Sequence, residues 1–277
     1  MIRADLHVHT YYSDGTQSPL DVIKGALRAG VNLISVTDHD NSNGKNEVLS
    51  LAAEYGLKAV GGEEISAYDG GTKVHLLGYN MDTGCKAFKD FTKKLFDGAE
   101  ERTEDILKKL RALGVKLSRE EICAERYCPT SPVHSFYIAV AGAKKGYEKD
   151  AYSFYMRYLN SGGEAFSCLG RPSPEEATQA IVSSGGICSL AHPGRITLEK
   201  EGVNKLIRRL IPCGLSGIEA VYSSHTVEQT QYYKELAEKF GLLVTGGSDT
   251  HHIGGNKRIG TPVFYPSEEL LSALKII

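Results

Sequence analysis

The chain has 277 residues, with 32 Lys+Arg against 34 Asp+Glu, a formal net charge of −2 and 41% hydrophobic residues. This balance excludes a strongly basic protein that coats nucleic acid, and no apolar run reaches the roughly 18 residues that a membrane-spanning helix needs. A chain of this length is expected to form one large α/β unit, or such a unit with an insertion.

The N-terminal segment and the cysteines indicate the compartment. The first residues contain no apolar core of signal-peptide length, and the six cysteines include no C-x-x-C pair. We therefore expect a cytoplasmic protein with reduced thiols, without a structural zinc knuckle and without a membrane partner.

Short apolar runs alternate with amphipathic helical patterns along most of the chain. This alternation predicts βαβ units and a parallel sheet. Strands are predicted at residues 2–6, 33–37, 58–62, 74–78, 187–191, 217–221 and 242–246. Helices are predicted between them at 20–29, 45–55, 174–184, 204–211 and 227–240.

The alternation stops between residues 84 and 165, where three helical stretches are predicted at 86–113, 133–145 and 147–159, with Gly98 as a candidate break. We interpret residues 84–165 as a helical cap inserted into a barrel that 1–83 and 166–277 form. The cap carries 15 Lys+Arg and 12 Asp+Glu. That small positive excess suits an anionic substrate, but it is more typical of a solvated helical face.

A pair of histidines follows the first predicted strand. His7 and His9 are two residues apart, so in an extended chain both side chains point to the same face. This is good geometry for a shared metal ion. Asp14 comes soon afterwards, before Gly15, where a turn residue is the simpler interpretation.

Most of the other predicted strands also carry His, Asp or Glu, most of them at the C-terminal end. A parallel barrel gathers these ends at one mouth, where active sites of such barrels lie. Imidazole and carboxylate ligands together suit Zn²⁺, Mn²⁺ or Fe²⁺, and so many buried charged groups without partners would be costly. His75 fits this rule least well, because it lies near the start of its apolar run. The His, Asp and Glu residues at these predicted strands are His39, Glu63, Glu64, His75, His192, Asp249 and His251.

The ordered motifs DLHVHT, TDHD, GxEIS, VHLLGY, AHPGR and GSDTH resemble those of the PHP (polymerase and histidinol phosphatase) family, and they extend from Asp5 to His251. The helical insertion between the His75 and His192 motifs resembles the branch of small bacterial phosphoesterases. That branch acts on nucleotide 3′,5′-bisphosphates, short RNA 5′ ends or five-membered cyclic phosphates. The resemblance implies an α/β fold, a distorted (β/α)₇ barrel with a helical cap, which agrees with seven predicted strands.

The resemblance also implies three divalent metal ions, which would be Mn²⁺, Zn²⁺ or Fe²⁺, and it selects Glu64 rather than Glu63. A hydroxide that bridges the first two ions would attack phosphorus, and the third ion would bind a phosphoryl oxygen. The ligands implied are His7, His9, Glu64 and Asp249 for the first ion; Glu64, His75 and His192 for the second; and Asp14, His39 and His251 for the third.

Several further residues are candidates for contact with the substrate. Arg195, beside His192, is expected to bind phosphate with its planar fork, and His225 is either a proton donor to the leaving group or a loop residue. In the related branch an Arg-x-His pair opens a cap helix. Here His134 is present but Pro132 replaces the arginine, which weakens the case for a bisphosphate. Hydroxyl contacts are expected instead from Thr130 and Ser131, with Tyr12 as a further candidate.

The leading hypothesis is thus a metal-dependent phosphoesterase for a small phosphorylated substrate, a nucleotide 3′,5′-bisphosphate or a short oligonucleotide. The main alternative is a phosphodiesterase for a five-membered cyclic sugar phosphate. Histidinol phosphatase and a non-catalytic metal-binding module rank lower. The slightly acidic charge argues against extended nucleic acid, and the oligomeric state stays open.

Overall fold

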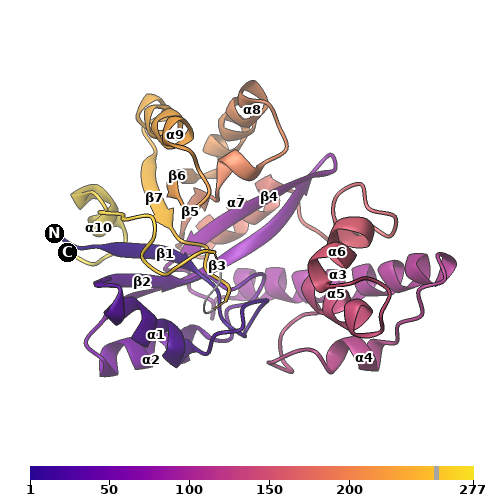
Figure 1. Ribbon diagram of the computed structural model, residues 1–277. Helices are drawn as coiled ribbons and strands as arrows, with labels where there is room; N and C mark the ends of the chain where they lie inside the picture. Colours follow the sequence, from indigo (N-terminus) through magenta and orange to yellow (C-terminus); the bar gives the residue numbers. More distant parts are fainter. Residues whose placement is uncertain (253–255) are drawn as a thin grey trace.

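The computed structural model describes residues 1–252 and 256–277, which form a seven-stranded sheet that is nearly closed into a barrel with helices around it (Figure 1). The strands follow one another in chain order. Backbone bonds join the ends of the sheet, since the Asp249 amide donates to the His7 carbonyl at 2.7 Å. The strands are β1 (Ala4–Val8), β2 (Leu33–Val36), β3 (Lys58–Asp69), β4 (Thr72–Tyr79), β5 (Ile187–Leu190), β6 (Leu215–Tyr222) and β7 (Leu243–Gly247).

The barrel helices bury one apolar face each against this sheet. On one side Ile23 and Val48 pack against Ile34, while Ile181 and Ile207 belong to the larger cluster on the other side. Figure 1 shows α1 and α2 on the side of the sheet opposite α8 and α9. These helices are α1 (Pro19–Arg28), α2 (Lys45–Glu54), α7 (Pro174–Ser183), α8 (Lys200–Leu210), α9 (Val227–Phe240) and α10 (Glu268–Ala273).

The expected distorted barrel is confirmed, but the prediction of a parallel sheet is wrong around β4. This strand runs antiparallel to both β3 and β5. The cause is a tight hairpin at Gly70 (φ +55°) and Gly71 (φ +95°), which leaves no room for a crossover helix. As a result, the N-terminal half of β4 reaches the barrel mouth. His75 therefore lies at the mouth although it is near the start of its strand.

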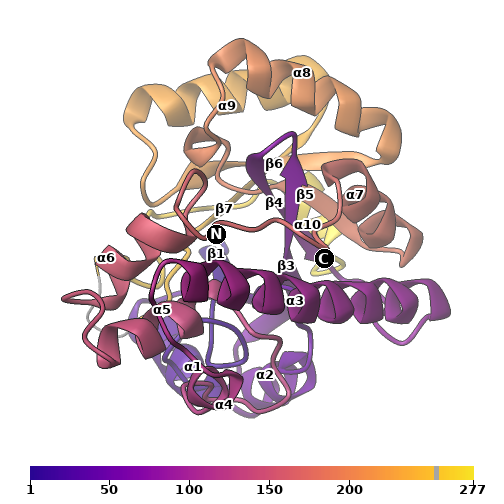
Figure 2. The ribbon, with the colours of Figure 1, turned by 90° about the vertical axis from the view of Figure 1, so that its right-hand side faces the viewer.

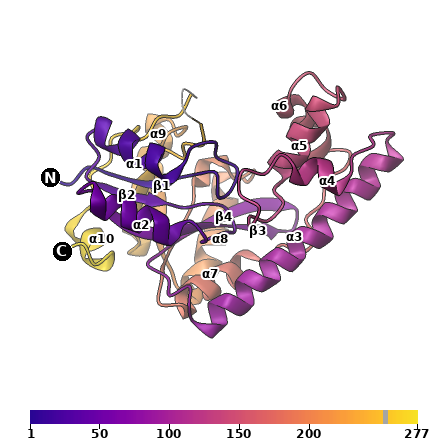
Figure 3. The same ribbon diagram turned by 90° about the horizontal axis from the view of Figure 1, so that it is seen from below.

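The cap segment begins on the barrel and ends in a hydrophobic cluster of its own. Phe88 of the long helix α3 packs in the barrel-side cluster, whereas Leu110 packs with Tyr137 in the second cluster. Figures 2 and 3 show α3 passing from the barrel to the smaller helices. The division at residues 84 and 166 stays a prediction. These elements are α3 (Lys86–Ala112), α4 (Arg119–Cys123), α5 (Ser135–Lys144), α6 (Ala151–Phe154) and a π-helix (Tyr155–Leu159).

Gly98 was a candidate break, but α3 continues through it without interruption. It lies where the helix crosses the returning chain, and a Cβ atom here would collide with the backbone of Gly170. Glycine at this position therefore permits close packing of α3 on the barrel. Within the described residues, no helix is both long and apolar enough to cross a membrane.

Candidate metal centre and substrate cavity

Four buried side chains converge on one point at the barrel mouth. His7 and His9 alternate along β1 and its end, Glu64 comes from β3, and Asp249 follows β7. Glu64 Oε2 lies 3.0 Å from His7 Nε2 and 3.2 Å from His9 Nε2, and His9 Nε2 is 3.2 Å from Asp249 Oδ1. The pair of histidines thus shares a face, as the spacing predicts.

Glu64 also joins this group to a second one. Its other oxygen, Oε1, lies 2.7 Å from His75 Nδ1 and 2.9 Å from His192 Nε2. His39 Nδ1 is 3.2 Å from Oε2. A single carboxylate therefore contacts imidazoles that come from β1, β4 and the ends of β2 and β5, which makes Glu64 the centre of the cluster.

A third group lies on the cap side of the mouth. Asp14 Oδ1 is 3.3 Å from His251 Nε2, and Asp14 Oδ2 is 3.9 Å from His39 Nε2. The loop that carries Asp14 is held by Ser13, whose hydroxyl donates to Asp38 at 2.6 Å. The structure therefore brings all nine residues that the sequence singles out as metal ligands into three adjoining groups.

The donor set fits divalent metal ions. His9 Nδ1 is buried without a hydrogen-bond partner among the described residues, and the close contacts of His39 Nδ1 and Asp14 Oδ1 lack hydrogen-bond geometry. The Nε2 atoms of His7 and His9 lie 3.1 Å apart, which requires a shared proton or a bound cation. Neutral imidazoles with carboxylates are ligands for Zn²⁺, Mn²⁺ and Fe²⁺.

Glu64 and His75 are in the protonation states that metal binding needs. Desolvation favours the neutral form of Glu64, but the surrounding His7 and His39 outweigh it and hold the pKa of Glu64 well below its usual range. Desolvation lowers the pKa of His75 to about 3. At neutral pH the central carboxylate is thus ionised and His75 is neutral, which are the forms that bind metals.

Glu219, which the sequence reasoning missed, supports the cluster from behind. It is fully buried in β6, with Oε1 2.9 Å from His7 Nδ1, while Oε2 accepts a bond from the His192 amide at 2.7 Å. It therefore orients two cluster residues at once. The sequence does contain a signal for this role, because an acidic residue within the apolar run of a predicted strand needs a buried partner.

Glu63 points to the opposite face of β3 and lies outside the cluster. It is fully buried, and neither carboxyl oxygen has a hydrogen-bond partner in the described part of the chain. Desolvation, together with the charge of Asp40, raises the pKa of Glu63 to about 8. The geometry thus separates two adjacent glutamates that periodicity alone could not distinguish.

Replacing Glu63 by Gln should stabilise the protein above pH 8 and have little effect near pH 4. In the folded state the carboxyl keeps its proton up to about pH 8, against an ordinary value of 4.5. Between pH 4.5 and about pH 8 the folded wild type binds one proton more than the unfolded chain, so its free energy of unfolding falls as the pH rises through this range. Urea unfolding at pH 5 and pH 8.5 should show a gain above about 1 kcal/mol for the variant at the higher pH only. An equal change in the free energy of unfolding at both pH values would contradict the raised pKa of Glu63.

Arg195 and His134 line cavities beside the cluster. A cavity of about 760 Å³ includes Arg195, whose Nη1 lies 3.1 Å from the Tyr222 hydroxyl and 3.3 Å from Asp249 Oδ2. A smaller cavity of about 350 Å³, between barrel and cap, includes His134 and His252. His252, which directly follows the predicted ligand His251, therefore lies near the site.

The other predicted contact residues are not among those that line these two cavities. The Ser131 hydroxyl donates to the Tyr12 carbonyl at 2.6 Å, and the Thr130 carbonyl accepts a bond from Asn43 at 3.5 Å. These contacts join the cap loop to the barrel loop. His225 accepts a bond from the Gly194 amide at Nε2 and contacts the Ala220 carbonyl through Nδ1. His225 thus connects the backbone at Gly194, next to Arg195, to strand β6.

The sequence matches the family model of the PHP domain over residues 5–166. The chain belongs to the PHP family. A 3′,5′-nucleoside bisphosphate phosphatase of Chromobacterium violaceum is 30% identical over 262 residues, 94% of this chain and 91% of that protein. A phosphoribosyl 1,2-cyclic phosphate 1,2-diphosphodiesterase of Eggerthella lenta is 30% identical over 89% of this chain and 93% of its own.

Two further PHP-type relatives complete this picture. A 5′-3′ exoribonuclease of Haemophilus influenzae is 30% identical over 90% of both chains. A solved structure described as an amidohydrolase from Chromobacterium violaceum, with bound sulfate and no metal, superposes with a TM-score of 0.86. It is 28% identical and covers 98% of this chain and 96% of its own. The similarity to these proteins therefore includes the cap as well as the barrel.

Proposed function

We propose that this PHP protein is a metal-dependent phosphoesterase that hydrolyses a small phosphorylated substrate, a nucleotide 3′,5′-bisphosphate or a short oligonucleotide. The observation that carries the proposal is the convergence of His, Asp and Glu side chains at the barrel mouth beside a cavity of about 760 Å³. Relatives that are named for a nucleoside bisphosphate and for RNA support the substrate class.

Three divalent ions, Mn²⁺, Zn²⁺ or Fe²⁺, are proposed to occupy the three groups of side chains. When bound, such ions lower the pKa of water towards 7 and neutralise phosphoryl oxygens. The chain itself supplies orientation, because Glu219 holds His7 and the backbone of His192 in place. The cap contributes His134, Phe136 and Tyr155 to the wall of the smaller cavity beside the mouth.

We propose that Arg195 binds the phosphate under attack. It lies at the rim of the larger cavity, its side chain is 56% exposed, and it contacts Asp249. A guanidinium in this position presents two parallel N–H groups to phosphate. His225 is proposed to position this arginine through the Gly194 amide, which leaves the proton donor to the leaving group open.

Replacing Arg195 by Ala should lower kcat/KM by about 100-fold or more, as removal of an oxyanion donor does in other hydrolases, while metal content stays the same. Arg195→Lys should recover only part of the rate, because Lys keeps the charge but lacks the fork. Steady-state phosphate release and elemental analysis measure the two quantities. An unaltered rate in the Ala variant would remove Arg195 from the mechanism.

A cyclic phosphodiesterase is the second candidate. The Eggerthella lenta relative has the same identity as the bisphosphate phosphatase, and Pro132 stands where the related branch has arginine. The test is phosphate release by metal-loaded protein from a nucleoside 3′,5′-bisphosphate, a ribose cyclic phosphate, histidinol phosphate and a short RNA. The best substrate decides between the candidates, and no release from any of them would overturn the phosphoesterase proposal.

A further inference from the structure

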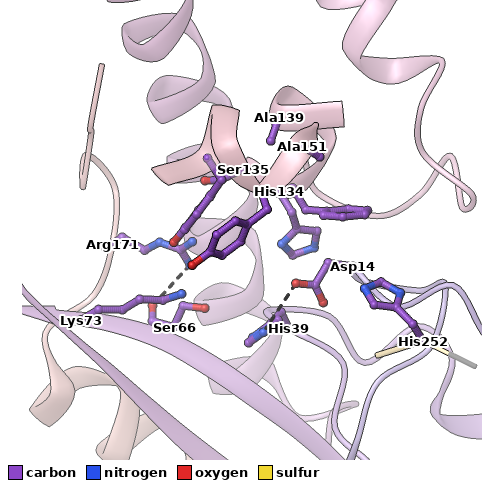
Figure 4. A pocket seen from close by; sticks show the side chains of 13 residues that line it. Asp14, His39, Ser66, Lys73, His134, Ser135, Ala139, Ala151, Arg171 and His252 are labelled. Carbon is purple, nitrogen blue, oxygen red and sulfur yellow. Dashed lines mark hydrogen bonds and ion pairs between the residues drawn. The ribbon is translucent and has the colours of Figure 1, made fainter. Parts of the chain in front are cut away.

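Asp14 is the predicted metal ligand that lies farthest along the chain from the strand before it, in the loop between β1 and α1. Its carboxylate completes the third group, with His251 Nε2 at 3.3 Å and His39 Nε2 at 3.9 Å. Figure 4 shows Asp14 joined to His39, with His134 of the cap facing Asp14 across the cavity between barrel and cap. The sheet does not fix Asp14 directly, so other contacts have to hold its loop.

The barrel holds the Asp14 loop from the inside. The Ser13 hydroxyl donates to Asp38 Oδ1 at 2.6 Å, and the Thr10 amide donates to the same oxygen at 2.8 Å. The Gly15 amide donates to the Thr10 carbonyl at 3.1 Å, and a Cβ atom at Gly15 would collide with this carbonyl. These contacts close the loop tightly and leave the carbonyl groups of Tyr12 and Ser13 to partners outside the loop.

The cap supplies a partner for each of these two carbonyl groups. The Ser131 hydroxyl donates to the Tyr12 carbonyl at 2.6 Å, and the Tyr137 hydroxyl of α5 donates to the Ser13 carbonyl. The Ser13 carbonyl and the Asp14 amide belong to one planar peptide unit. The bond from Tyr137 therefore fixes the peptide plane that leads into Asp14.

Tyr137 makes this contact from the hydrophobic core of the cap. Its side chain is fully buried in the cluster that contains Leu110, and its ring centre lies 5.7 Å from that of Phe136. Desolvation, followed by the charge of Asp14, raises the pKa of Tyr137, so the hydroxyl keeps its proton and can donate it. The place of this hydroxyl is thus set by the packing of the cap.

The chain that returns from the cap holds the neighbouring loop, which carries His39. The Arg171 guanidinium contacts the Asp40 carboxylate, which also accepts a bond from the Ser66 amide at 2.7 Å. Arg171 and Lys73 complete the wall of the smaller cavity. Among the described residues, no side chain of the cap makes a hydrogen bond to a ligand of the first group. The cap region thus holds loops of the third group and leaves the first group to the barrel.

We propose that Tyr137 is a positioning residue for Asp14, and that docking of the cap on the barrel sets the metal affinity of the third group. The inference rests on the proposed function, from which it takes the three metal ions, and it adds a coupling between the cap and the metal centre. Coupling between two sites is reciprocal. A metal ion in the third group should therefore also stabilise the docked cap.

Titration of metal-free protein with Mn²⁺ in a calorimeter tests the positioning role. Tyr137→Phe keeps the ring in the cap core and removes only the hydroxyl. One of the three Mn²⁺ equivalents should then bind about tenfold more weakly, the lower end of the effect for outer-shell partners. Tyr158→Phe is the matched control, because Tyr158 is buried in the same cluster and, among the described residues, makes no hydrogen bond to the Asp14 loop.

A second variant identifies the ion that responds. Asp14→Ala should bind two Mn²⁺ ions, and adding Tyr137→Phe to it should have no further effect on metal affinity, because the two residues act on the same ion. At saturating Mn²⁺, Tyr137→Phe alone should release phosphate as fast as the wild type, since every ligand is intact. A residue that acted in the reaction itself would not be rescued in this way.

Hydrogen exchange of the α5 amides tests the reciprocal effect. Addition of Mn²⁺ should slow their exchange in the wild type and in Tyr158→Phe by about tenfold more than in Tyr137→Phe. Equal protection in Tyr137→Phe and the wild type would contradict the coupling between cap and metal.

The metal titration judges the inference separately from the proposed function. Unchanged Mn²⁺ affinities in Tyr137→Phe would overturn the inference, and so would equal weakening of all three equivalents, which indicates a general loss of packing. Uptake of only two ions by the wild type would also overturn it, while phosphate release by that protein would leave the phosphoesterase proposal intact. Uptake of three ions without hydrolysis of any phosphate ester would overturn the proposed function alone.

Discussion

A Glu64→Gln variant is expected to lose metal and activity together. The two carboxylate oxygens of Glu64 lie within 3.2 Å of nitrogens of five histidines, so the carboxylate is common to two of the groups that could hold a metal ion. An amide offers one acceptor oxygen and no charge. Because loss of an outer-shell partner alone changes metal affinity by about 10–100-fold, loss of this central ligand should exceed about 100-fold.

Glu63→Gln is the matched control for this experiment. The two residues are adjacent, fully buried and chemically alike, but only Glu64 faces the histidines. Elemental analysis by mass spectrometry and phosphate release should show wild-type values for Glu63→Gln and neither metal nor activity for Glu64→Gln. Full metal content in the Glu64 variant would contradict the assignment of this residue as the shared ligand.

Replacing Glu219 by Gln should weaken metal binding by about 10–100-fold without abolishing it. Glu219 accepts from His7 and from the His192 backbone, so it sets both the tautomer and the position of cluster residues. Desolvation opposes protonation of His7, but Glu219 together with Glu64 and Asp249 outweighs it and raises the pKa of His7 well above its usual value. The amide retains the shape of the side chain and loses this charge.

Metal titration of the Glu219 variant measures this effect. Activity should return at high metal concentration, because the ligands themselves are intact. Glu235→Gln, on the exposed face of α9, should behave as the wild type does. If added metal fails to restore activity while the protein stays folded, Glu219 acts in the reaction itself and the positioning role is wrong.

Local patterns predicted the seven strands and placed most of the site residues at the barrel mouth, because apolar runs with acidic or imidazole residues near their ends are visible in the sequence alone. The choice of Glu64 over Glu63 came only from the family resemblance. The direction of β4 depends on the Gly70–Gly71 hairpin. A pattern of alternating strands and helices does not show that such a turn reverses the chain. That one turn explains both the antiparallel ladders and the place of His75.

The walls of the cavity were harder to predict, because they depend on how the cap packs on the barrel. Lys73 could have been found from its spacing to His75, since both share a face of β4. Arg171 has no comparable signal, because its partner Asp40 is 131 positions away in sequence. The bond from the Ser131 hydroxyl to the Tyr12 carbonyl, which joins cap to barrel, could not be predicted either, and contact of these two residues with substrate stays a prediction.

The most direct test of the account is phosphate release from a nucleoside 3′,5′-bisphosphate before and after metal removal. Protein stripped with a chelator should release no phosphate, and stepwise addition of Mn²⁺, Zn²⁺ or Fe²⁺ should restore release as the cluster fills. Arg195→Ala loaded with the same metal should bind it and stay nearly inactive. Release that is equally fast in the stripped protein would contradict the claim that the cluster at the barrel mouth is the catalytic centre.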